Sequence, residues 1–356
     1  MLTKVKGGDI NLSSSFLIQK FSKEYSTINF DLPVFNRETA TSLSVARSGL
    51  VGASVGNYAL FAGGATTQYS DVVDSYNTTL TRATPTVLSA KRNLLTATTV
   101  GNYALFGGGV NGTGSLSTID AYDSTLVMTT SASLSVAREE LAATSVGNYA
   151  IFAGGYTYND DELDVVDAYD SSLTRTTPTV LSARRTLLAA TTVGNYALFG
   201  GGNYNISTNV VDAYNSSLTR TTPTVLSQAM VYLAATSVGN YALFGGGWTG
   251  SYSDVVDAYD TSLTRTIPTS LSVARGYLAA TTIGNYALFS GGKSESSSYS
   301  DKVNAYSFKR YTIQVYPGTK YKFSNMPSEL TSSTFQEISI TGQPVGYIKV
   351  KNSNIN

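Results

Sequence analysis

The chain contains no cysteine and no histidine among its 356 residues. Without cysteine a disulfide framework is impossible, and the redox compartment cannot be inferred. Without histidine the commonest general base and the commonest transition-metal ligand are both missing. These absences exclude Ser-His, Cys-His and zinc-dependent catalysis. We therefore expect a protein that is not an enzyme and that uses no cofactor or metal.

Charge is scarce as well, since only 13% of the residues are charged and the 24 basic residues balance the 24 acidic ones. A nucleic-acid-binding protein would carry a basic patch or stripe, so we expect no nucleic-acid partner. The 42% hydrophobic content is ample for a core of substantial size.

Long apolar runs are also lacking. The run Phe16-Leu17-Ile18 is too short for the core of a signal peptide. No stretch approaches the roughly 20 apolar residues of a membrane span. The sequence predicts no membrane span, and it favours a virion or cytoplasmic location over classical secretion.

The most prominent feature of the sequence is a repeated nine-residue motif. Gly-Asn-Tyr-Ala-Leu/Ile-Phe-x-Gly-Gly occurs six times at spacings of 45 to 47 residues, starting at Gly56, Gly101, Gly147, Gly194, Gly239 and Gly284. Each unit also carries an Asp/Asn-Ala/Ser-Tyr segment and a Leu-Ser-x-Ala-Arg-like stretch. A fixed period in this range is typical of a repeat architecture.

One unit predicts four short strands. In the fifth unit these are residues 233–238, 241–244, 255–259 and 263–267, the last of which stops at Pro268. Gly239-Asn240 is a hairpin turn between the first two, and residues 260–262 form another turn between the last two. Four antiparallel strands per unit, repeated radially, describe the blade of a β-propeller.

We therefore predict an all-β chain with a six-bladed propeller over residues 33–308. Residues 41–47 have the same sequence as residues 269–275, the segment that precedes the sixth unit, but no repeat unit lies N-terminal to residues 41–47. The simplest account is that residues 33–42 supply the outer strand of the last blade, which closes the ring and hides an edge. An N-terminal extension (1–32) and a C-terminal β-rich module (309–356) lie outside the repeat. The module should dock on the propeller, on residues 1–32 or on another chain.

The glycine doublet, the following tyrosine and the recurring arginine resemble the kelch repeat across about residues 33–306. The units depart from it in one respect, because leucine stands where kelch repeats usually carry tryptophan on the fourth strand. The departures are Leu80, Leu126, Leu173, Leu218 and Leu263. The resemblance implies binding of proteins or glycans, and only a minority of kelch propellers are enzymes. The copper-radical oxidase of this architecture is excluded, because it needs histidine and cysteine.

Comparison of the six units shows where they differ. The Gly-Asn turn and the turn after the third strand hardly change, and both should lie on one face of the disc. The loops after the second strand and the residue pairs before the first strand vary, and both should lie on the other face. Tyrosine, serine, glycine and asparagine in loops on a rigid scaffold are typical of recognition surfaces. We predict ligand contacts there from Tyr156, Tyr158, Tyr204, Tyr232, Trp248, Tyr252 and Tyr277. Unconstrained drift is the alternative explanation.

Five arginines recur at one position, and Met230 replaces the arginine in the fifth unit. They are Arg47, Arg92, Arg138, Arg185 and Arg275. They are candidates for binding an acidic or sugar-carboxylate ligand through forked contacts. Alternatively, each holds backbone carbonyls or an aspartate within the blades. The regular recurrence of the third-strand aspartate favours hydrogen bonding over catalysis.

The acidic loop with Asp160, Asp161, Glu162 and Asp164 is either solvated or a calcium site, although it lacks the spacing of a known calcium loop.

These observations predict a non-enzymatic binding or structural protein whose variable face meets a protein or glycan. The terminal segments would attach it to a larger assembly. The low charge, the Ser/Thr-rich β content and the small β appendage are similar to those of kelch-like proteins of bacteriophage virions and tails, which would give it a role in adhesion. Two alternatives stay open: a cytosolic kelch-type adaptor and a carbohydrate-active enzyme that uses carboxylates.

Overall fold

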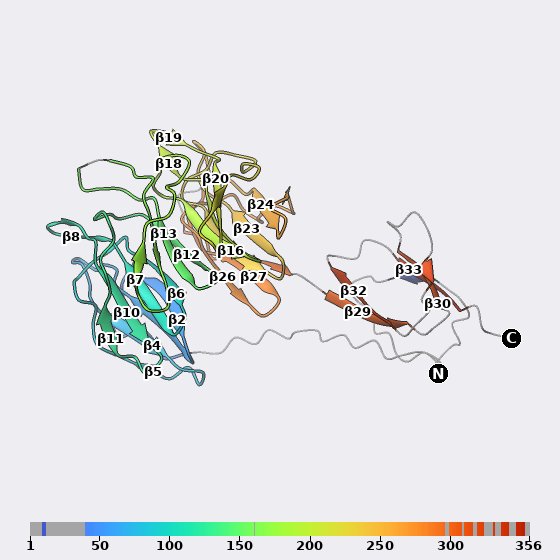
Figure 1. Ribbon diagram of the computed structural model, residues 1–356, viewed down its shortest axis with the longest axis horizontal. Coiled ribbons are helices and arrows are strands. Elements are labelled where there is room, and N and C mark those ends of the chain that lie inside the picture. Colours follow the sequence, from blue (N-terminus) through green and yellow to red (C-terminus); the bar gives the residue numbers. More distant parts are fainter. Residues whose placement is uncertain are drawn as a thin grey trace. The chain divides into compact units, whose positions relative to one another are not determined.

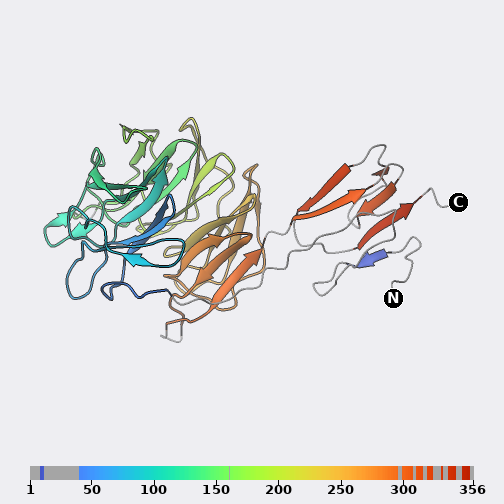
Figure 2. The ribbon, with the colours of Figure 1, turned by 90° about the horizontal axis from the view of Figure 1, so that it is seen from below.

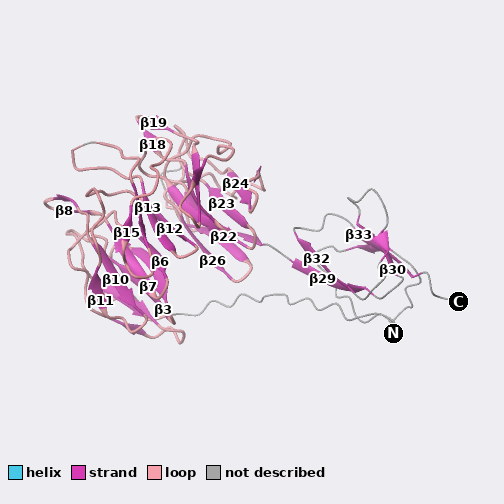
Figure 3. Ribbon diagram, in the orientation of Figure 1, coloured by secondary structure: helices cyan, strands magenta, loops and turns pink. Residues whose placement is uncertain are grey.

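The computed structural model describes residues 9–11, 40–159, 161–295, 299–307, 310–315, 319–323, 330–331, 336–341 and 347–352. These residues form strands, turns and loops and no helix, so none of them lies in a helix able to cross a membrane (Figure 3). The chain divides into two compact units, residues 38–306 and residues 1–37 with 307–356.

The larger unit is a six-bladed β-propeller arrangement of small antiparallel sheets, which follow one another in chain order (Figures 1 and 2). Blades 1 to 3 consist of β2 (Val51–Val55), β3 (Tyr58–Ala62), β4 (Val73–Tyr76) and β5 (Arg82–Ala83); β6 (Thr96–Val100), β7 (Tyr103–Gly107), β10 (Ile119–Asp123) and β11 (Met128–Thr130); and β12 (Ala142–Val146), β13 (Tyr149–Ala153), β14 (Val166–Tyr169) and β15 (Arg175–Thr176). Blades 4 to 6 consist of β16 (Ala189–Val193), β17 (Tyr196–Gly200), β20 (Val211–Asn215) and β21 (Arg220–Thr221); β22 (Ala234–Val238), β23 (Tyr241–Gly245), β24 (Val256–Asp260) and β25 (Arg265–Thr266); and β26 (Ala279–Ile283), β27 (Tyr286–Ser290) and β28 (Val303–Ser307).

The first strands of successive blades lie side by side, from β2 through β6, β12, β16 and β22 to β26. Two further hairpins extend loops of blades 2 and 4, namely β8 (Val110–Asn111) with β9 (Gly114–Ser115) and β18 (Asn203–Tyr204) with β19 (Ile206–Ser207).

The hydrophobic cores lie between blades. In one of them Ile151 and Val166 of blade 3 pack with Phe199 and Tyr214 of blade 4. Phe199 and Tyr214 are fully buried and meet edge to face, with their ring centroids 5.9 Å apart. Burying such an aromatic side chain contributes about 1.5–3 kcal/mol. A single sheet leaves one face uncovered, so each blade is stabilised by the next.

The fourth strand is shorter than the sequence predicts. The prediction began this strand at Leu263, but β25 contains only Arg265 and Thr266. Leu263 has a positive φ of 62°, and its amide donates to the Asp260 carbonyl. The Asp260 carboxylate also accepts from the amides of Ser262 and Thr264. Leu263 therefore lies in a side-chain-stabilised turn and not on a strand.

The outer strand that was predicted for the last blade lies mainly outside the described residues, because residues 33–39 are not described. Ala40 to Ser42 form no strand, and the sheet of blade 6 contains three strands among the described residues.

The smaller unit contains two sheets. Its strands are β1 (Asp9–Asn11), β29 (Arg310–Val315), β30 (Thr319–Phe323), β31 (Leu330–Thr331), β32 (Gln336–Thr341) and β33 (Tyr347–Asn352). One sheet has the order β1-β33-β30-β31, and the other pairs β29 with β32. Asp9 lies opposite Lys349, so the N-terminal and C-terminal segments share a sheet. This pairing matches one of the three docking places that the sequence left open for the C-terminal module.

Candidate functional site

The segments that differ between blades gather on one rim of the propeller. In every blade an isolated bridge joins the residue pair before the first strand to the loop after the second strand. The six bridges are Ser48–Ala65, Asn93–Val110, Glu139–Tyr156, Thr186–Asn203, Val231–Trp248 and Gly276–Lys293. We call these pairs and loops the variable rim.

The Gly-Asn turns and the turns after the third strand meet on the opposite side of each blade, which we call the repeated rim. A Cβ placed on Gly194 would lie only 2.9 Å from Cγ2 of Thr261 in the next blade. The same approach, to a serine Cβ, recurs at Gly56, Gly101 and Gly147. Close packing between blades therefore restricts these turns to small residues.

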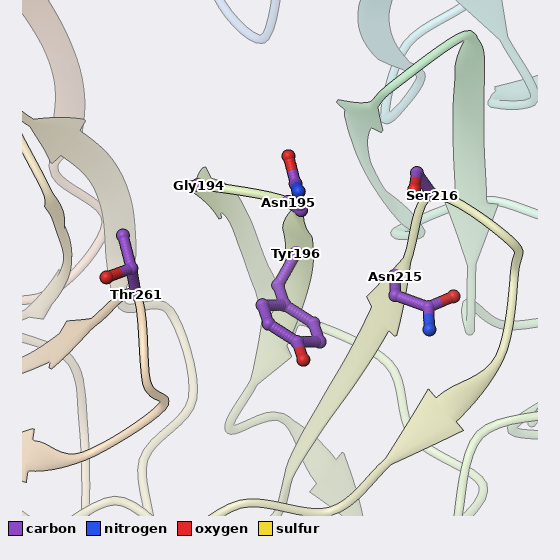
Figure 4. A pocket seen from close by; sticks show the side chains of 6 residues that line it. All are labelled: Gly194, Asn195, Tyr196, Asn215, Ser216 and Thr261. Atoms are coloured by element: carbon purple, nitrogen blue, oxygen red, sulfur yellow. The ribbon is translucent and has the colours of Figure 1, made fainter.

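A hollow of about 470 Å³ opens on the repeated rim between blades 4 and 5 (Figure 4). It is lined by Gly194, Asn195, Tyr196, Asn215, Ser216 and Thr261. All of these residues belong to the two repeated turns or their flanks, so the hollow reflects blade geometry and not a feature particular to one blade.

On the variable rim, one residue per blade lies two positions before the first strand. These residues are Gly49, Leu94, Glu140, Leu187, Tyr232 and Tyr277, and all have a positive φ between 52° and 65°. They touch from blade to blade, because the amide of Glu140 donates to the Leu94 carbonyl and that of Leu187 to the Glu140 carbonyl. The amide of Tyr277 donates in the same way to the Tyr232 carbonyl. Identical backbone positions thus present glycine, leucine, glutamate or tyrosine.

Aromatic residues concentrate at blades 5 and 6. The rings of Tyr232 and Tyr277 stack with centroids 3.9 Å apart. Trp248 and Tyr252 meet edge to face at 4.9 Å. Tyr252 also borders Tyr277, since its ring lies 3.3 Å from where a Cβ of Gly276 would be. We call Tyr232, Trp248, Tyr252 and Tyr277 the aromatic cluster.

A cation and an exposed ring extend this cluster. The Lys293 ammonium lies 5.7 Å from the Tyr277 ring centroid and 5.4 Å from that of Tyr299. Tyr277 is 52% exposed and Tyr299 is 81% exposed. The Glu295 carboxylate accepts a hydrogen bond from the Tyr252 amide. The sequence prediction missed Lys293, Glu295 and Tyr299, which stand singly in a serine-rich loop.

Two neighbouring carboxylates lie on the variable rim at the start of blade 3. Glu139 is buried and accepts a hydrogen bond from the Ser115 hydroxyl at 3.4 Å, while Glu140 accepts one from Thr186 at 3.1 Å. Burial raises the pKa of both carboxyl groups. Glu140 lies close enough to Tyr277 to add to the rise in the pKa of that phenol, whose main cause is burial. The Glu140 carboxylate and the Tyr277 ring therefore lie in the same part of the rim.

Blade 5 also departs from the repeat beneath the aromatic cluster. Met230 is buried in the place of the arginine, and Gln228 accepts a hydrogen bond from the Ser253 hydroxyl. Asp257, the aspartate that pairs with this arginine in other blades, is held by Ser227 and by Arg265 at 3.2 Å. Burial raises the pKa of Asp257. Gln228 and Met230 therefore lie in the same connector as Tyr232, between β21 and β22.

The recurring arginines lie inside the blades and not on the rim surface, which supports the alternative that each holds backbone carbonyls or an aspartate over a role in ligand binding. Their side chains are fully buried in Arg92, Arg138, Arg185 and Arg275, and the Arg47 side chain is equally covered. Arg185 is typical, because its guanidinium contacts the Asp212 carboxylate at 2.5 Å and donates to the carbonyls of Phe199 and Val210. The guanidinium thereby joins β17, which contains Phe199, to β20 and the residue before it, which supply Asp212 and Val210, and these charge-assisted hydrogen bonds compensate for its burial.

The remaining predicted contact residues lie on blades 3 and 4 of the variable rim. Tyr156 bridges to Glu139, Tyr158 is exposed and lies against Gly114 of blade 2, and Tyr204 is exposed on β18. They are separate in sequence and blade from the aromatic cluster. In the acidic loop, Asp160 lies outside the described residues. Among the residues that are described, no group of three or more His, Cys, Asp or Glu side chains could hold a metal ion.

Known proteins resemble this chain in fold. No protein-family profile matches the sequence, and no curated protein matches it. A solved structure titled "Structure of YjhT" is similar with a TM-score of 0.60 and 11% sequence identity, over 77% of this chain and 97% of that one. At that identity the likeness supports the propeller fold alone.

Proposed function

We propose that this protein is a non-enzymatic recognition protein that presents its variable rim to a glycan or a protein. The observation that carries the proposal is the gathering of Tyr232, Trp248, Tyr252 and Tyr277 at blades 5 and 6. Leucine fills the corresponding rim position in blades 2 and 4, so the scaffold does not require an aromatic residue there. Rigid aromatic side chains provide large contact areas at low cost in conformational entropy.

The chemistry of the rim supports such a ligand. Exposed ring faces offer apolar contact, while the Lys293 ammonium and the carboxylates of Glu140 and Glu295 offer a donor and acceptors beside them. A sugar ring has apolar C–H faces and hydroxyl edges, and a protein surface combines the same two features. We expect neither to be turned over, because the rim offers no histidine or cysteine to catalyse it.

We propose further that the repeats are kelch-like and that the protein is a component of a bacteriophage virion or tail with a role in adhesion. The glycine doublets, strand-three tyrosines and buried arginines support the first point. The small unit that joins both chain termini supports the second, because it offers a means of attachment to a larger assembly through residues 1–32 and 309–356. A cytosolic kelch-type adaptor is the alternative.

The test is binding of the full chain to an array of immobilised bacterial surface glycans. The matched variant replaces Tyr232, Trp248, Tyr252 and Tyr277 with alanine, and a control replaces Leu94 and Leu187 at the same rim position. We expect the wild-type protein and the leucine variant to bind and the aromatic variant to lose at least tenfold in signal. Equal binding by all three would refute the assignment of the site, and turnover of any glycan would refute the non-enzymatic function.

A further inference from the structure

The extra hairpin of blade 2 carries the only Asn-Gly pair of the chain, Asn111-Gly112. The pair belongs to the loop of residues 110–117 on the variable rim. Asn111 lies opposite Gly114 in the hairpin, so Gly112 and Thr113 form its two-residue turn. Gly112 and Thr113 are exposed, and Asn111 is half-buried. Water therefore reaches this turn from outside.

The Asn111 side chain is held over the turn. Its Oδ1 atom accepts hydrogen bonds from the Thr113 amide at 2.8 Å and from the Thr113 hydroxyl at 2.6 Å. An asparagine that bonds the backbone two residues further on folds its side-chain amide back over the peptide between them. The amide carbon Cγ of Asn111 is therefore directed along the chain, toward the peptide that contains the Gly112 nitrogen.

The Gly112 nitrogen is unhindered. Among the residues that the structure describes, no acceptor takes a hydrogen bond from its N–H group. A Cβ built on Gly112 would meet no atom within 4 Å. Glycine also allows more backbone conformations than any other residue, so the turn can reach the geometry that a cyclisation needs.

We propose that Asn111 converts spontaneously to aspartate and isoaspartate through a cyclic imide, which makes this turn a modification site. The Gly112 nitrogen attacks Cγ of Asn111 and gives up its proton, and a new N–Cγ bond closes a five-membered ring. The Cγ–Nδ2 bond breaks, and Nδ2 leaves with that proton as ammonia. Water then opens the ring. Cleavage of the new N–Cγ bond gives aspartate, and cleavage of the original peptide C–N bond gives isoaspartate.

Thr113 promotes the cyclisation. Attack at Cγ turns Oδ1 into an oxyanion, and hydrogen-bond donors that already point at such an oxygen lower the barrier. The amide and the hydroxyl of Thr113 both donate to Oδ1 before the reaction begins. The attacking nitrogen belongs to the adjacent residue, so no bimolecular encounter is needed.

Asn77 of blade 1 provides a matched comparison within the same chain. Its Oδ1 atom accepts hydrogen bonds from the Thr79 amide at 3.0 Å and from the Thr79 hydroxyl at 2.8 Å, which are the same donors as at Asn111. The residue that follows is Thr78 and not glycine. Its β-branched side chain restricts the approach of its own nitrogen. We therefore expect Asn77 to keep its amide while Asn111 reacts.

The conversion changes the variable rim. Either product adds a negative charge to the loop of residues 110–117, and isoaspartate also adds a carbon atom to the main chain of the hairpin. Tyr158 of blade 3 lies against this hairpin, because its Cγ is 3.5 Å from where a Cβ of Gly114 would be. Ageing of the protein thus alters the charge of blade 2 and the support of a tyrosine in blade 3. This inference does not depend on the function proposed above.

The test incubates the full chain at neutral pH and follows its peptides by mass spectrometry over days to weeks. We expect Asn111 to gain the mass of an amide-to-acid exchange as two separable products, aspartate and isoaspartate, while Asn77 stays unchanged. Formation of aspartate alone would overturn the proposal, because direct hydrolysis of the side-chain amide yields no isoaspartate. Conversion of Asn111 no faster than that of Asn77 would overturn it as well.

Two variants separate the contributions, and thermal unfolding checks that both are folded. Gly112→Ala fits the open turn, and we expect it to slow the conversion by about tenfold or more because the added methyl group hinders the attacking nitrogen. Thr113→Ala removes the hydroxyl and keeps the amide donor, so a slowing of about threefold is expected from the loss of one hydrogen bond. A wild-type rate in Gly112→Ala would refute attack by this nitrogen. A wild-type rate in Thr113→Ala would refute the contribution of the hydroxyl.

Discussion

The two rims of the propeller are built from the same six repeats, yet they differ in what restricts them. On the repeated rim, the glycine of each Gly-Asn turn lies against the neighbouring blade, and a single added carbon at Gly194 would come within 2.9 Å of Thr261. On the variable rim, equivalent positions accept glycine, leucine, glutamate or tyrosine on the same backbone. Packing alone accounts for the constancy of the first rim. The contrast between a constant rim and a variable rim is therefore not evidence that the variable rim was selected for binding. The case for recognition depends instead on the clustering of aromatic residues on the variable rim.

The largest difference should come from breaking the scaffold that both rims share. Arg185→Met removes the closer arginine partner of Asp212 and leaves this buried carboxylate with Ser182 and with Arg220 at 3.8 Å, so we expect the free energy of unfolding to fall by about 3 kcal/mol. Urea denaturation measures this change. Met230 occupies the same position in blade 5, and Met230→Leu should cost less than about 1.5 kcal/mol because it conserves volume. A neutral Arg185→Met would show that the clamp is dispensable.

Substitution on the repeated rim should have the next largest effect. Gly194→Ala introduces both a strained positive φ of 53° and a clash with Thr261, and we expect a loss of about 2 kcal/mol. Gly284→Ala introduces a similar φ of 51° at an open place. We expect Gly284→Ala to lower the unfolding midpoint less than Gly194→Ala does, because no atom lies within 4 Å of the carbon that it adds. Equal losses in both variants would show that the strained φ, and not the contact with Thr261, causes the effect.

The missing arginine of blade 5 should appear in the pH dependence of stability. Burial raises the pKa of Asp257 in the folded state. The native protein therefore binds this proton more tightly than the unfolded chain, whose aspartate pKa is about 3.9. The contribution of Asp257 to stability should fall as the pH rises from about 3.9 through the folded pKa. Asp257→Asn should remove this dependence, which unfolding midpoints across that range would reveal.

Asp74 of blade 1 provides the matched comparison. Burial opposes ionisation of Asp74, but hydrogen bonds from Ser44 and Arg47 outweigh it and lower the pKa of Asp74. Its contribution should be present above about pH 3.9 and should be lost as the pH falls through its folded pKa. Opposite signs for Asp74→Asn and Asp257→Asn are expected, and equal signs would refute the role of Met230.

Truncation on the variable rim should have the smallest effect on stability. Tyr299→Ala and Tyr277→Ala alter exposed side chains, and we expect each to change the free energy of unfolding by less than about 1 kcal/mol. Thermal unfolding checks this. A loss as large as that of Gly194→Ala would mean that these rings stabilise the fold and are not free for a ligand.

The sequence predicted the blades well because two signals agree. Short apolar runs between turn residues indicate each strand, and the repeat of 45 to 47 residues indicates each sheet. It failed at Leu263, where β-propensity favoured a strand but the Asp260 carboxylate stabilises a turn. It left two roles open for the arginines, ligand binding and contacts within the blades, because their aspartate and carbonyl partners come from segments distant in sequence. Tyr232, Trp248 and Tyr252 could be named from their loops. Their meeting with Lys293 could not, because it depends on how two blades pack.

The most direct measurement of the central claim compares matched substitutions at one rim position in different blades. Tyr232→Ala and Tyr277→Ala are set against Leu94→Ala and Leu187→Ala in binding to the same glycan array, with folding checked by thermal unfolding. The account predicts at least a tenfold loss for each tyrosine variant and a change of less than twofold for each leucine variant. Equal losses in all four variants, or none in any, would contradict a recognition site at blades 5 and 6.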